Sequence, residues 1–526
     1  MYTLVVNICK PTTVISFLLL EIRRRGPQPA KSSIDLLNLF SSSQNQQQLR
    51  RSSRFTENAA PAVQPTAIYD LVEKAVESFC DQREQISCDK DAPYRTIDGT
   101  CNNLQNKLTG AAFTPQSRFL EPTYGDRPRN QMNVITSYLD LSSVYGSSKE
   151  RLDQLRQHEN GELAVGDNDL LPNTPPGAPE ECKRKCFIAG IHYSLFMLLS
   201  NFRLFYLGVD WNPGDKRHSE VPLLAMFHII FVREHNRIAK ELSDLNTEWK
   251  DEKLFQETRK ILTGVYQHIV FNEFVTALVG PKYANIISLT SSSKGYQTFY
   301  SPYLDGSSRN EFGATAFRYG HSQVGNHVGA SGDDFKELRR SLMQNESFDV
   351  KTIRDPENKF GVKRMGRWMS ATLGDKTDRF ISDQMRNHLF EVQPGEAFDL
   401  GALNTQRGRD HGIAGYNEYR EYCGLYRAKH FGNAYGGLVD HDKSTARALS
   451  EVYSHPDDID LFVGGISEKP ASGESILGPT FRCLIALQFL NYKHGDRFFY
   501  ENKFPATGFT LENLRAKEYA VTICQG

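Results

Sequence analysis

The chain has 526 residues, enough for one large domain or for several smaller ones. Lys and Arg number 62 and Asp and Glu 63, so the net charge of −1 gives no electrostatic reason to expect nucleic acid or an anionic membrane as a partner. Hydrophobic residues at 39% and charged residues at 24% are ordinary for a soluble protein with a substantial core. Nine cysteines allow a few disulfides but no disulfide-dense scaffold.

The first 68 residues lack the pattern of a folded domain. Residues 1–26 contain a short apolar run that is followed by arginines, whereas a secretory signal carries its basic residues first. We interpret them as a degraded signal or N-terminal segment. Residues 27–68 are rich in Ser, Gln, Asn and Arg and are expected to form a disordered linker or pro-segment. The folded domain is therefore expected to span residues 69–526.

Helical periodicity dominates the remainder. Residues 222–241, 252–279 and 311–325 each place apolar side chains along one helical face, and alternation of period two is scarce. No transmembrane span is predicted, because the most apolar window, 191–209, is interrupted by polar and charged residues. The sequence predicts a mainly α-helical fold, a large single domain with few short strands. Such a domain often encloses a cofactor between its helices.

His321 is the first candidate for chemistry. It falls on the apolar face of the helix expected over 311–325, beside Phe317 and Val324. One interpretation is a partly buried structural histidine, and the other is an axial haem ligand held against a flat apolar cofactor. An axial ligand needs a further residue that fixes its ring through a hydrogen bond.

Two further segments have a plain and a functional interpretation. Arg217 and Glu220 lie just before the helix that Pro222 opens; they form either a solvated pair or a charge-stabilising group at a reaction centre. In TSYLDLSSVYG, the oxygen-bearing residues Thr136, Tyr138, Asp140 and Ser142 alternate, which suits a calcium ion but is also typical of an exposed strand or turn.

Three polar runs near the C-terminal end have the composition of ordinary loops. They are LNTQRGRDHG at 403–412, the acidic turn and strand-like apolar run DDIDLFVGG at 457–465, and DHD at 440–442. The last could be taken for an acid/base pair. Its position after a Gly-rich loop favours a solvated turn instead.

Taken together and in this order, these segments resemble the animal haem peroxidase family over roughly residues 85–523. The matching runs are CDKDAPYRTIDGTCNNL at 88–104, TSYLDLSSVYGSS from 136, CFIAG at 186–190, DKRHSEVP at 215–222, FVREHNRIA at 231–239, AFRYGH at 316–321, LNTQRGRDHGIAGYNEYR from 403, DDIDLFVGG at 457–465 and GPTFRC at 478–483. Peroxidasin and chorion-type peroxidases look the most similar. Each run is short, but their common order makes a chance match negligible.

The resemblance implies a role for each matching residue. His321 matches the proximal ligand of the haem iron, and Asn404 matches the asparagine that accepts its ring N–H. Arg217 matches the distal arginine, which makes it the candidate catalytic residue. Glu220 matches a glutamate that can form an ester with a haem methyl, and Arg318 matches an arginine that pairs with a haem propionate. The implied cofactors are haem b, with a covalent link as an option, and calcium.

The same resemblance covers the calcium loop and the cysteines. Thr136, Tyr138, Asp140 and Ser142 match calcium ligands. The implied disulfides are Cys88–Cys101, Cys182–Cys186 and Cys423–Cys483. Cys524 falls where the family has another half-cystine, and Cys9 and Cys80 remain unassigned.

The chain departs from the family in three places. The family's distal helix, with a motif like WGQFxDHD that carries the distal histidine and a calcium-binding aspartate, is missing after Asp126. An apolar insertion occupies 191–214, and the C-terminal part looks shortened. A misassembled or alternatively spliced product of an active peroxidase gene would explain the first two departures, and real divergence is the other explanation.

These observations predict a haem peroxidase that uses hydrogen peroxide to oxidise a halide, a phenol or a protein side chain, with this chain impaired because the distal histidine is absent. The alternative is a catalytically inactive peroxidase-like protein that serves adhesion or binds extracellular matrix proteins. A third class is a calcium-stabilised binding module without haem. The disulfides and the sequon at Asn345 predict a secreted protein.

Overall fold

The computed structural model describes residues 86–122, 131–172, 214–291, 295–296, 300–347, 349, 351–354, 360–391, 394–472, 474–503 and 508–510. Several features singled out in the sequence lie outside these residues: the expected N-terminal segments, the position after Asp126 where the family's distal segment is expected to be missing, Cys182, Cys186, Cys524 and all but the last residue of the insertion. The chain divides into two compact units, residues 1–90 with 451–453 and residues 91–450 with 454–526. Apart from Cys88 and the end of α20 (Lys443–Val452), the named helices, strands and contacts lie in the second unit.

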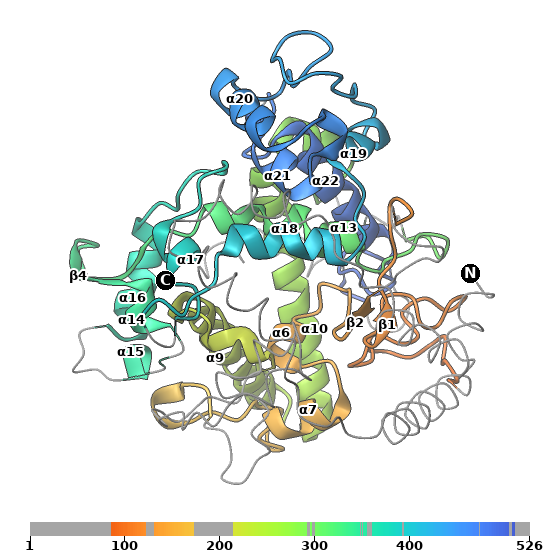
Figure 1. Cartoon of the computed structure of the whole chain (residues 1–526). Helices are drawn as coiled ribbons and strands as arrows, with labels where there is room; N and C mark the ends of the chain where they lie inside the picture. Colours follow the sequence, from red (N-terminus) through yellow and green to blue (C-terminus); the bar gives the residue numbers. More distant parts are fainter. Residues whose placement is uncertain are drawn as a thin grey trace, which may run out of the picture. The chain divides into compact units, whose positions relative to one another are not determined.

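The fold is mainly α-helical, as the sequence predicted (Figure 1). The strands of the described part form two antiparallel pairs, β1 (Thr114–Pro115) with β2 (Met132–Asn133) and β3 (His327–Ser331) with β4 (Glu337–Leu342). The helices of the described part include α6 (Ser142–Tyr145), α7 (Lys149–Leu155), η3 (Lys216–Ser219), α9 (Pro222–Leu245), α10 (Asp251–Ile269), η4 (Val270–Phe274), α11 (Val275–Val279), α13 (Asn310–Ala314), η5 (Ala316–Ser322), α16 (Val362–Ala371), α18 (Leu400–Asp410), α19 (Tyr416–Tyr422), α20 (Lys443–Val452), α21 (Leu461–Ile466) and α22 (Pro479–His494). They also include η2 (Asp167–Asp169), α12 (Pro281–Ile286), α14 (Met343–Glu346), α15 (Lys351–Arg354), α17 (Asp383–Asn387) and η7 (Pro456–Asp458).

The two long helices expected from the sequence are present. α9 begins at Pro222, whose fixed φ suits the first helical position, and it buries one face in the core that it shares with α10 and α16. α10 continues through the π-helical segment η4 into α11, so the helix expected over 252–279 runs from Asp251 to Val279. Acidic residues in the first turn of α10 complement its dipole.

The expectation of one continuous helix over 311–325 is wrong. The chain forms α13, leaves helical geometry at Thr315 and resumes as the 3₁₀-helix η5. The Thr315 hydroxyl donates back to the Glu311 carbonyl, an interaction that bends helices and competes with their backbone pattern. The face predicted for Phe317 and His321 therefore does not exist, because residues four apart are not aligned in a 3₁₀-helix.

Two runs expected to be loops or strand-like are helices. LNTQRGRDHG lies mostly in α18, and the apolar run after Asp460 is α21, which is buried throughout. Two glycines make α21 a poor helix by propensity. A Cβ at Gly464 or Gly465 would collide with the rings of Tyr416 and Phe481, so close packing, which the sequence does not display, sets this helix in place.

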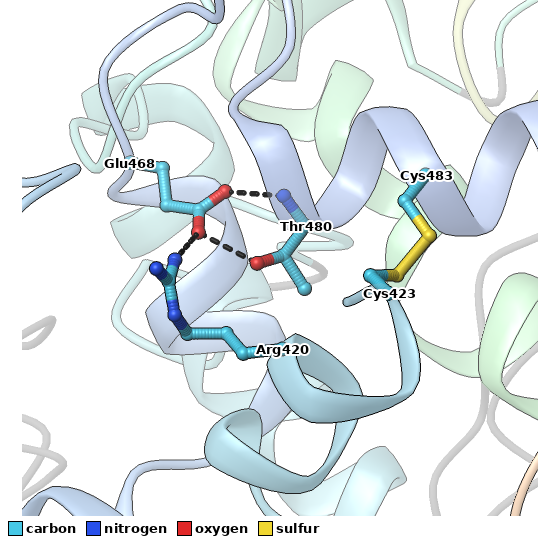
Figure 2. The surroundings of a disulfide bond; sticks show 5 residues. All are labelled: Arg420, Cys423, Glu468, Thr480 and Cys483. Atoms are coloured by element: carbon cyan, nitrogen blue, oxygen red, sulfur yellow. Dashed lines mark hydrogen bonds and ion pairs between the residues drawn. A yellow bond between two sulfur atoms is a disulfide. The ribbon is translucent and has the colours of Figure 1, made fainter. Parts of the chain in front are cut away.

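A disulfide and a buried carboxylate join the C-terminal helices (Figure 2). Cys423, directly after α19, is bonded to Cys483 in α22, as the family resemblance implied. Cys88 and Cys101 are each disulfide-bonded. Beside the Cys423–Cys483 bond, the Glu468 carboxylate accepts hydrogen bonds from the Thr480 backbone N–H and hydroxyl and pairs with Arg420, which stabilises the N-terminus of α22.

Among the described residues, no helix is both long and apolar enough to cross a membrane.

Candidate active site

Asp215 organises the short helix that carries Arg217. Its carboxylate caps η3 by accepting a hydrogen bond from the Arg217 backbone N–H at 2.9 Å. The same carboxylate binds the guanidinium through both oxygens, with Nε–Oδ1 at 3.0 Å and Nη2–Oδ2 at 2.6 Å. Burial raises the pKa of Asp215, but its hydrogen bonds and charge pairing with Arg217 outweigh burial and lower that pKa overall. Arg217 is exposed, and its charge is oriented by Asp215 rather than by Glu220.

Glu220 lies at the end of η3, where the chain turns into α9. Its Oε1 is buried and has no hydrogen-bond partner in the described part of the protein. Burial raises the pKa of Glu220 to about 7; the charges of Arg217 and Arg318 act against this shift, and the charge of Asp215 adds to it. Glu220 therefore gains and loses a proton near neutral pH, and one of its oxygens is open to a new partner.

His321 is half-buried near the end of η5. Its Nδ1 lies 2.8 Å from Nδ2 of Asn404, a fully buried residue of α18 (Figure 1 shows α18). The structure shows no hydrogen-bond partner for Nε2 among the described residues. Burial lowers the pKa of His321 to about 4, with a further contribution from the charge of Arg318, so the ring is neutral at pH 7. A neutral, oriented imidazole with one uncommitted nitrogen is what an axial metal ligand requires.

Arg318 joins this pair because η5 is a 3₁₀-helix. Residues three apart lie one above the other in such a helix, so Arg318 and His321 both reach Asn404. Arg318 Nη1 donates to Asn404 Oδ1 at 3.3 Å, and Arg318 Nε donates to the Gly313 carbonyl at 3.0 Å. The Asn404 side chain therefore contacts Arg318 with its oxygen and His321 with its nitrogen.

The charges around Arg318 suit an anionic cofactor. Burial lowers the pKa of Arg318 to about 10, and the positive charges of Arg407 and Arg217 lower it further against the opposing charge of Glu220. Arg217 of η3 and Arg407 of α18 are therefore near enough to Arg318 of η5 for their charges to act on it, which gives its surroundings an excess of positive charge. The carboxylates of a haem would relieve this repulsion, and His321 Nε2, which has no hydrogen-bond partner among the described residues, is the ring nitrogen that could reach its iron. The residues present therefore fit a haem.

The residues of the expected calcium loop make hydrogen bonds among themselves and to Thr109. Thr136, Asp140 and Ser142 lie together: the Thr136 hydroxyl donates to both Asp140 oxygens, and the Ser142 backbone N–H donates to Oδ1. The hydroxyl of Tyr138 instead donates to the carbonyl of Thr109. Within the described residues, no group of three or more His, Cys, Asp or Glu side chains could hold a metal ion.

The DHD run has structural contacts rather than the geometry of an acid/base pair. Asp440 pairs with Arg420, and Asp442 accepts the Thr445 N–H at the start of α20. His441 is fully buried and contacts the Gly464 carbonyl, so the expected solvated turn is wrong at this position. A cavity of about 50 Å³ in the described part, lined by Arg95, Arg259 and Tyr500 among others, contains none of the candidate residues.

Two residues of the site are not singled out by the sequence. Asp215 has a signal that could have found it, because an aspartate before a short helix is a strong N-cap candidate. Arg407 follows Asn404 by three residues and would be expected beside it if residues 403–412 were recognised as helical.

Comparison with known proteins identifies the family. The sequence profile described as animal haem peroxidase matches residues 94–128 and 125–524. The chain belongs to the animal haem peroxidase family. It is similar to a peroxidase-like protein of Margaritifera margaritifera, with 36% identity over 440 residues, 81% of this chain and 51% of that protein. A peroxidase of Drosophila melanogaster is 33% identical over 446 residues, 82% of this chain and 59% of that protein.

Human thyroid peroxidase is 30% identical over 410 residues, 76% of this chain and 41% of that protein. The chain thus spans about half the length of the curated relatives it matches. Among solved structures, peroxidase A of Dictyostelium discoideum has a TM-score of 0.65 at 24% identity, covering 82% of this chain and 98% of that one. A fatty acid alpha-dioxygenase of Oryza sativa has a TM-score of 0.62 at 16% identity, covering 95% and 92%. These structural likenesses show a shared fold.

Proposed function

We propose that this chain binds haem b, with His321 as the axial ligand of the iron and Arg318 as the partner of a haem carboxylate. When bound, the haem iron would supply the redox chemistry by which hydrogen peroxide oxidises a halide, a phenol or a protein side chain. The observation that carries the proposal is His321 fixed by Asn404, with its Nε2 uncommitted and a surplus of positive charge beside it. Glu220 Oε1, buried and unpaired, is the group available for a covalent link to the cofactor.

Arg217 is the group of this chain that would act on peroxide. Its permanently charged guanidinium, held by Asp215, can stabilise negative charge that develops on an oxygen atom. It cannot take a proton from one peroxide oxygen and deliver it to the other. That transfer needs a general acid/base, which is typically worth about 10²–10⁴-fold in rate.

We infer that the chain is impaired in this step because the family's distal segment is absent. The family profile matches in two separate stretches whose ends overlap at residues 125–128. The chain is continuous at this point, yet the profile matches it in two pieces. A chain that lacks an internal segment of the family gives such a divided match. This supports the departure after Asp126 that the sequence indicates.

Haem reconstitution tests the proposal. A Soret band is expected in the wild-type chain; it should be lost in His321→Ala and kept in His430→Ala, which removes an exposed histidine. Absence of a Soret band in the reconstituted wild type would refute haem binding and favour the calcium-stabilised module without haem. Equal bands in both variants would refute His321 as the ligand.

Peroxide turnover with guaiacol separates an impaired peroxidase from an inactive relative. We expect turnover about 10²–10⁴-fold below that of the same chain with a family distal segment inserted between Asp126 and Arg127. The alternative, a catalytically inactive adhesion or matrix-binding protein, is favoured by the missing segment and predicts no turnover above that of free haem. Full activity in the unaltered chain would refute the impairment.

The compartment and the metal belong to the same proposal. We propose a secreted protein, because the Cys423–Cys483 disulfide needs an oxidising route and Asn345, the acceptor of the sequon, is exposed. Relatives of this chain are named chorion peroxidase and peroxidasin, and extracellular matrix proteins are the partners that we propose. Calcium binding at Thr136–Ser142 is proposed as weak, since the loop offers a single carboxylate, Asp140.

A further inference from the structure

We propose that Asn404 couples the binding of a haem carboxylate to the coordination of iron. In the haem-free protein, Arg318 fixes the orientation of the Asn404 amide, and the amide in turn keeps the His321 proton on Nε2. A carboxylate that binds Arg318 releases the amide, which can then turn over and leave Nε2 free for the metal. The inference rests on the proposed haem site and adds a condition for its assembly.

The orientation of the Asn404 amide follows from the chemistry of its neighbours. A guanidinium can donate hydrogen bonds but cannot accept them, so the group that faces Arg318 Nη1 at 3.3 Å has to be the amide oxygen. The amide nitrogen then faces His321 Nδ1 at 2.8 Å. Asn404 is fully buried, so bulk water does not compete for either contact.

This orientation fixes the tautomer of His321. The amide NH₂ only donates, so Nδ1 has to accept, and a neutral imidazole whose Nδ1 accepts carries its proton on Nε2. A metal needs the lone pair of the nitrogen that it binds. The ring is thus oriented for coordination but holds its proton on the nitrogen that the iron would use.

A carboxylate on Arg318 would reverse this arrangement. The Arg318–Asn404 contact, at 3.3 Å, is long for a hydrogen bond, and a charge-assisted bond to a carboxylate is stronger. Arg318 is also repelled by Arg407 and Arg217, which favours an anionic partner. Once its oxygen is released, the amide can accept a proton from Nδ1. The ring then loses one proton from Nε2 and gains one at Nδ1 by exchange with water, and stays neutral.

The first test measures the coupling with haem and haem dimethyl ester, which lacks free carboxylates. In the wild type, the ester is expected to bind about 5–150-fold more weakly than haem and without the spectroscopic signature of an axial imidazole. In Arg318→Met the amide is free to turn, so the ester should show imidazole ligation and the affinity difference should disappear. Arg237→Met, which removes an exposed guanidinium of α9 that pairs with Glu234 and Glu241, should keep the wild-type difference.

The second test needs no cofactor. Nitrogen-15 spectra of the histidine rings, with His321 assigned by its absence in His321→Ala, report which ring nitrogen is protonated. We expect Nε2 in the haem-free wild type and a larger share of Nδ1 protonation in Arg318→Met, where the amide can turn. A wild-type His321 protonated on Nδ1 would overturn the coupling even if Arg318→Met fails to fold, as would imidazole ligation of the ester by the wild type. Failure of haem itself to bind would refute the proposed haem site, while the tautomer would still be measured.

Discussion

Glu220 is the residue of the site whose charge changes near neutral pH. Its pKa is about 7 in the folded protein, raised chiefly by burial, against about 4.5 in the unfolded chain. Between these values the folded state holds a proton that the unfolded chain has released, so this group makes stability fall as pH rises from about 4.5 to 7. Below pH 4.5 both states are protonated and the effect vanishes.

We predict that Glu220→Gln stabilises the haem-free protein at pH 7 but not at pH 4.5. Glutamine keeps the shape and cannot ionise, so the difference in the free energy of unfolding between variant and wild type should grow with pH, to on the order of 1–3 kcal/mol. Urea unfolding at several pH values measures it. Glu241→Gln, at an exposed ion pair with Arg237, should show no such growth; a pH-independent difference for Glu220→Gln would contradict the assigned pKa.

At this scale the sequence identifies the residues better than their contacts. His321, Asn404 and Arg318 can be named from motifs, and all three lie together. The sequence does not predict the direction of the hydrogen bonds between them. That direction depends on the contact of the Arg318 guanidinium with the Asn404 amide, which only the folded structure shows. The sequence also does not predict that Arg217 pairs with Asp215, because Glu220 lies at a similar distance along the chain and could equally be its partner.

At the scale of elements, periodicity located the helices whose burial is one-sided. α9 and the continuous α10–η4–α11 helix have an apolar stripe against the core, and the sequence predicts both. Periodicity fails for α18 and α21. α18 carries many polar residues because it lines the site, and α21 is buried on all sides, so neither shows an amphipathic pattern.

The junction between α21 and α22 leads to a prediction about stability. Glu468 is buried and accepts hydrogen bonds from Thr480 N–H, Thr480 Oγ1, Tyr416 OH and Arg420. Glu468→Ala should lower the free energy of unfolding by about 3–5 kcal/mol, because it leaves Arg420 short of a partner and the first turn of α22 uncapped.

Urea denaturation under non-reducing conditions measures this loss while the neighbouring Cys423–Cys483 bond stays intact. The matched control is Glu421→Ala, which removes an exposed carboxylate paired with Arg427 and should cost less than about 1 kcal/mol. Equal losses in the two variants would show that burial of the Glu468 network contributes nothing.

At the scale of the whole molecule, the site is assembled from segments far apart in the sequence. Residues 215–220, 318–321 and 404–407 meet although almost two hundred positions separate the first from the last. Local pattern cannot predict such a meeting, whereas the resemblance of ordered motifs to a family does. The family match is divided at residues 125–128, which supports the proposed loss of an internal segment at that point.

The proposed loss of a segment after Asp126 also bears on calcium, because the family resemblance implies that this segment carries a further carboxylate for the loop that begins at Thr136. Asp140 is almost fully buried, and both its oxygens already accept from the Thr136 hydroxyl. Its pKa is raised by burial, and the charges of Arg95 and Arg259 act on it in the opposite direction. These two guanidinium groups balance part of the negative charge of Asp140 and would repel a calcium ion.

We therefore predict that this chain binds calcium no more tightly than about 10⁻⁴ M, since the number of charged ligands sets affinity in such sites. Isothermal titration calorimetry with calcium measures this directly. Asp140→Asn removes the single carboxylate of the loop and should abolish the small heat of binding. The chain with a family segment restored after Asp126 should bind at least tenfold more tightly and lose that gain on Asp140→Asn. Tight binding by the unaltered chain would show that the loop between Thr136 and Ser142 is complete without the missing segment.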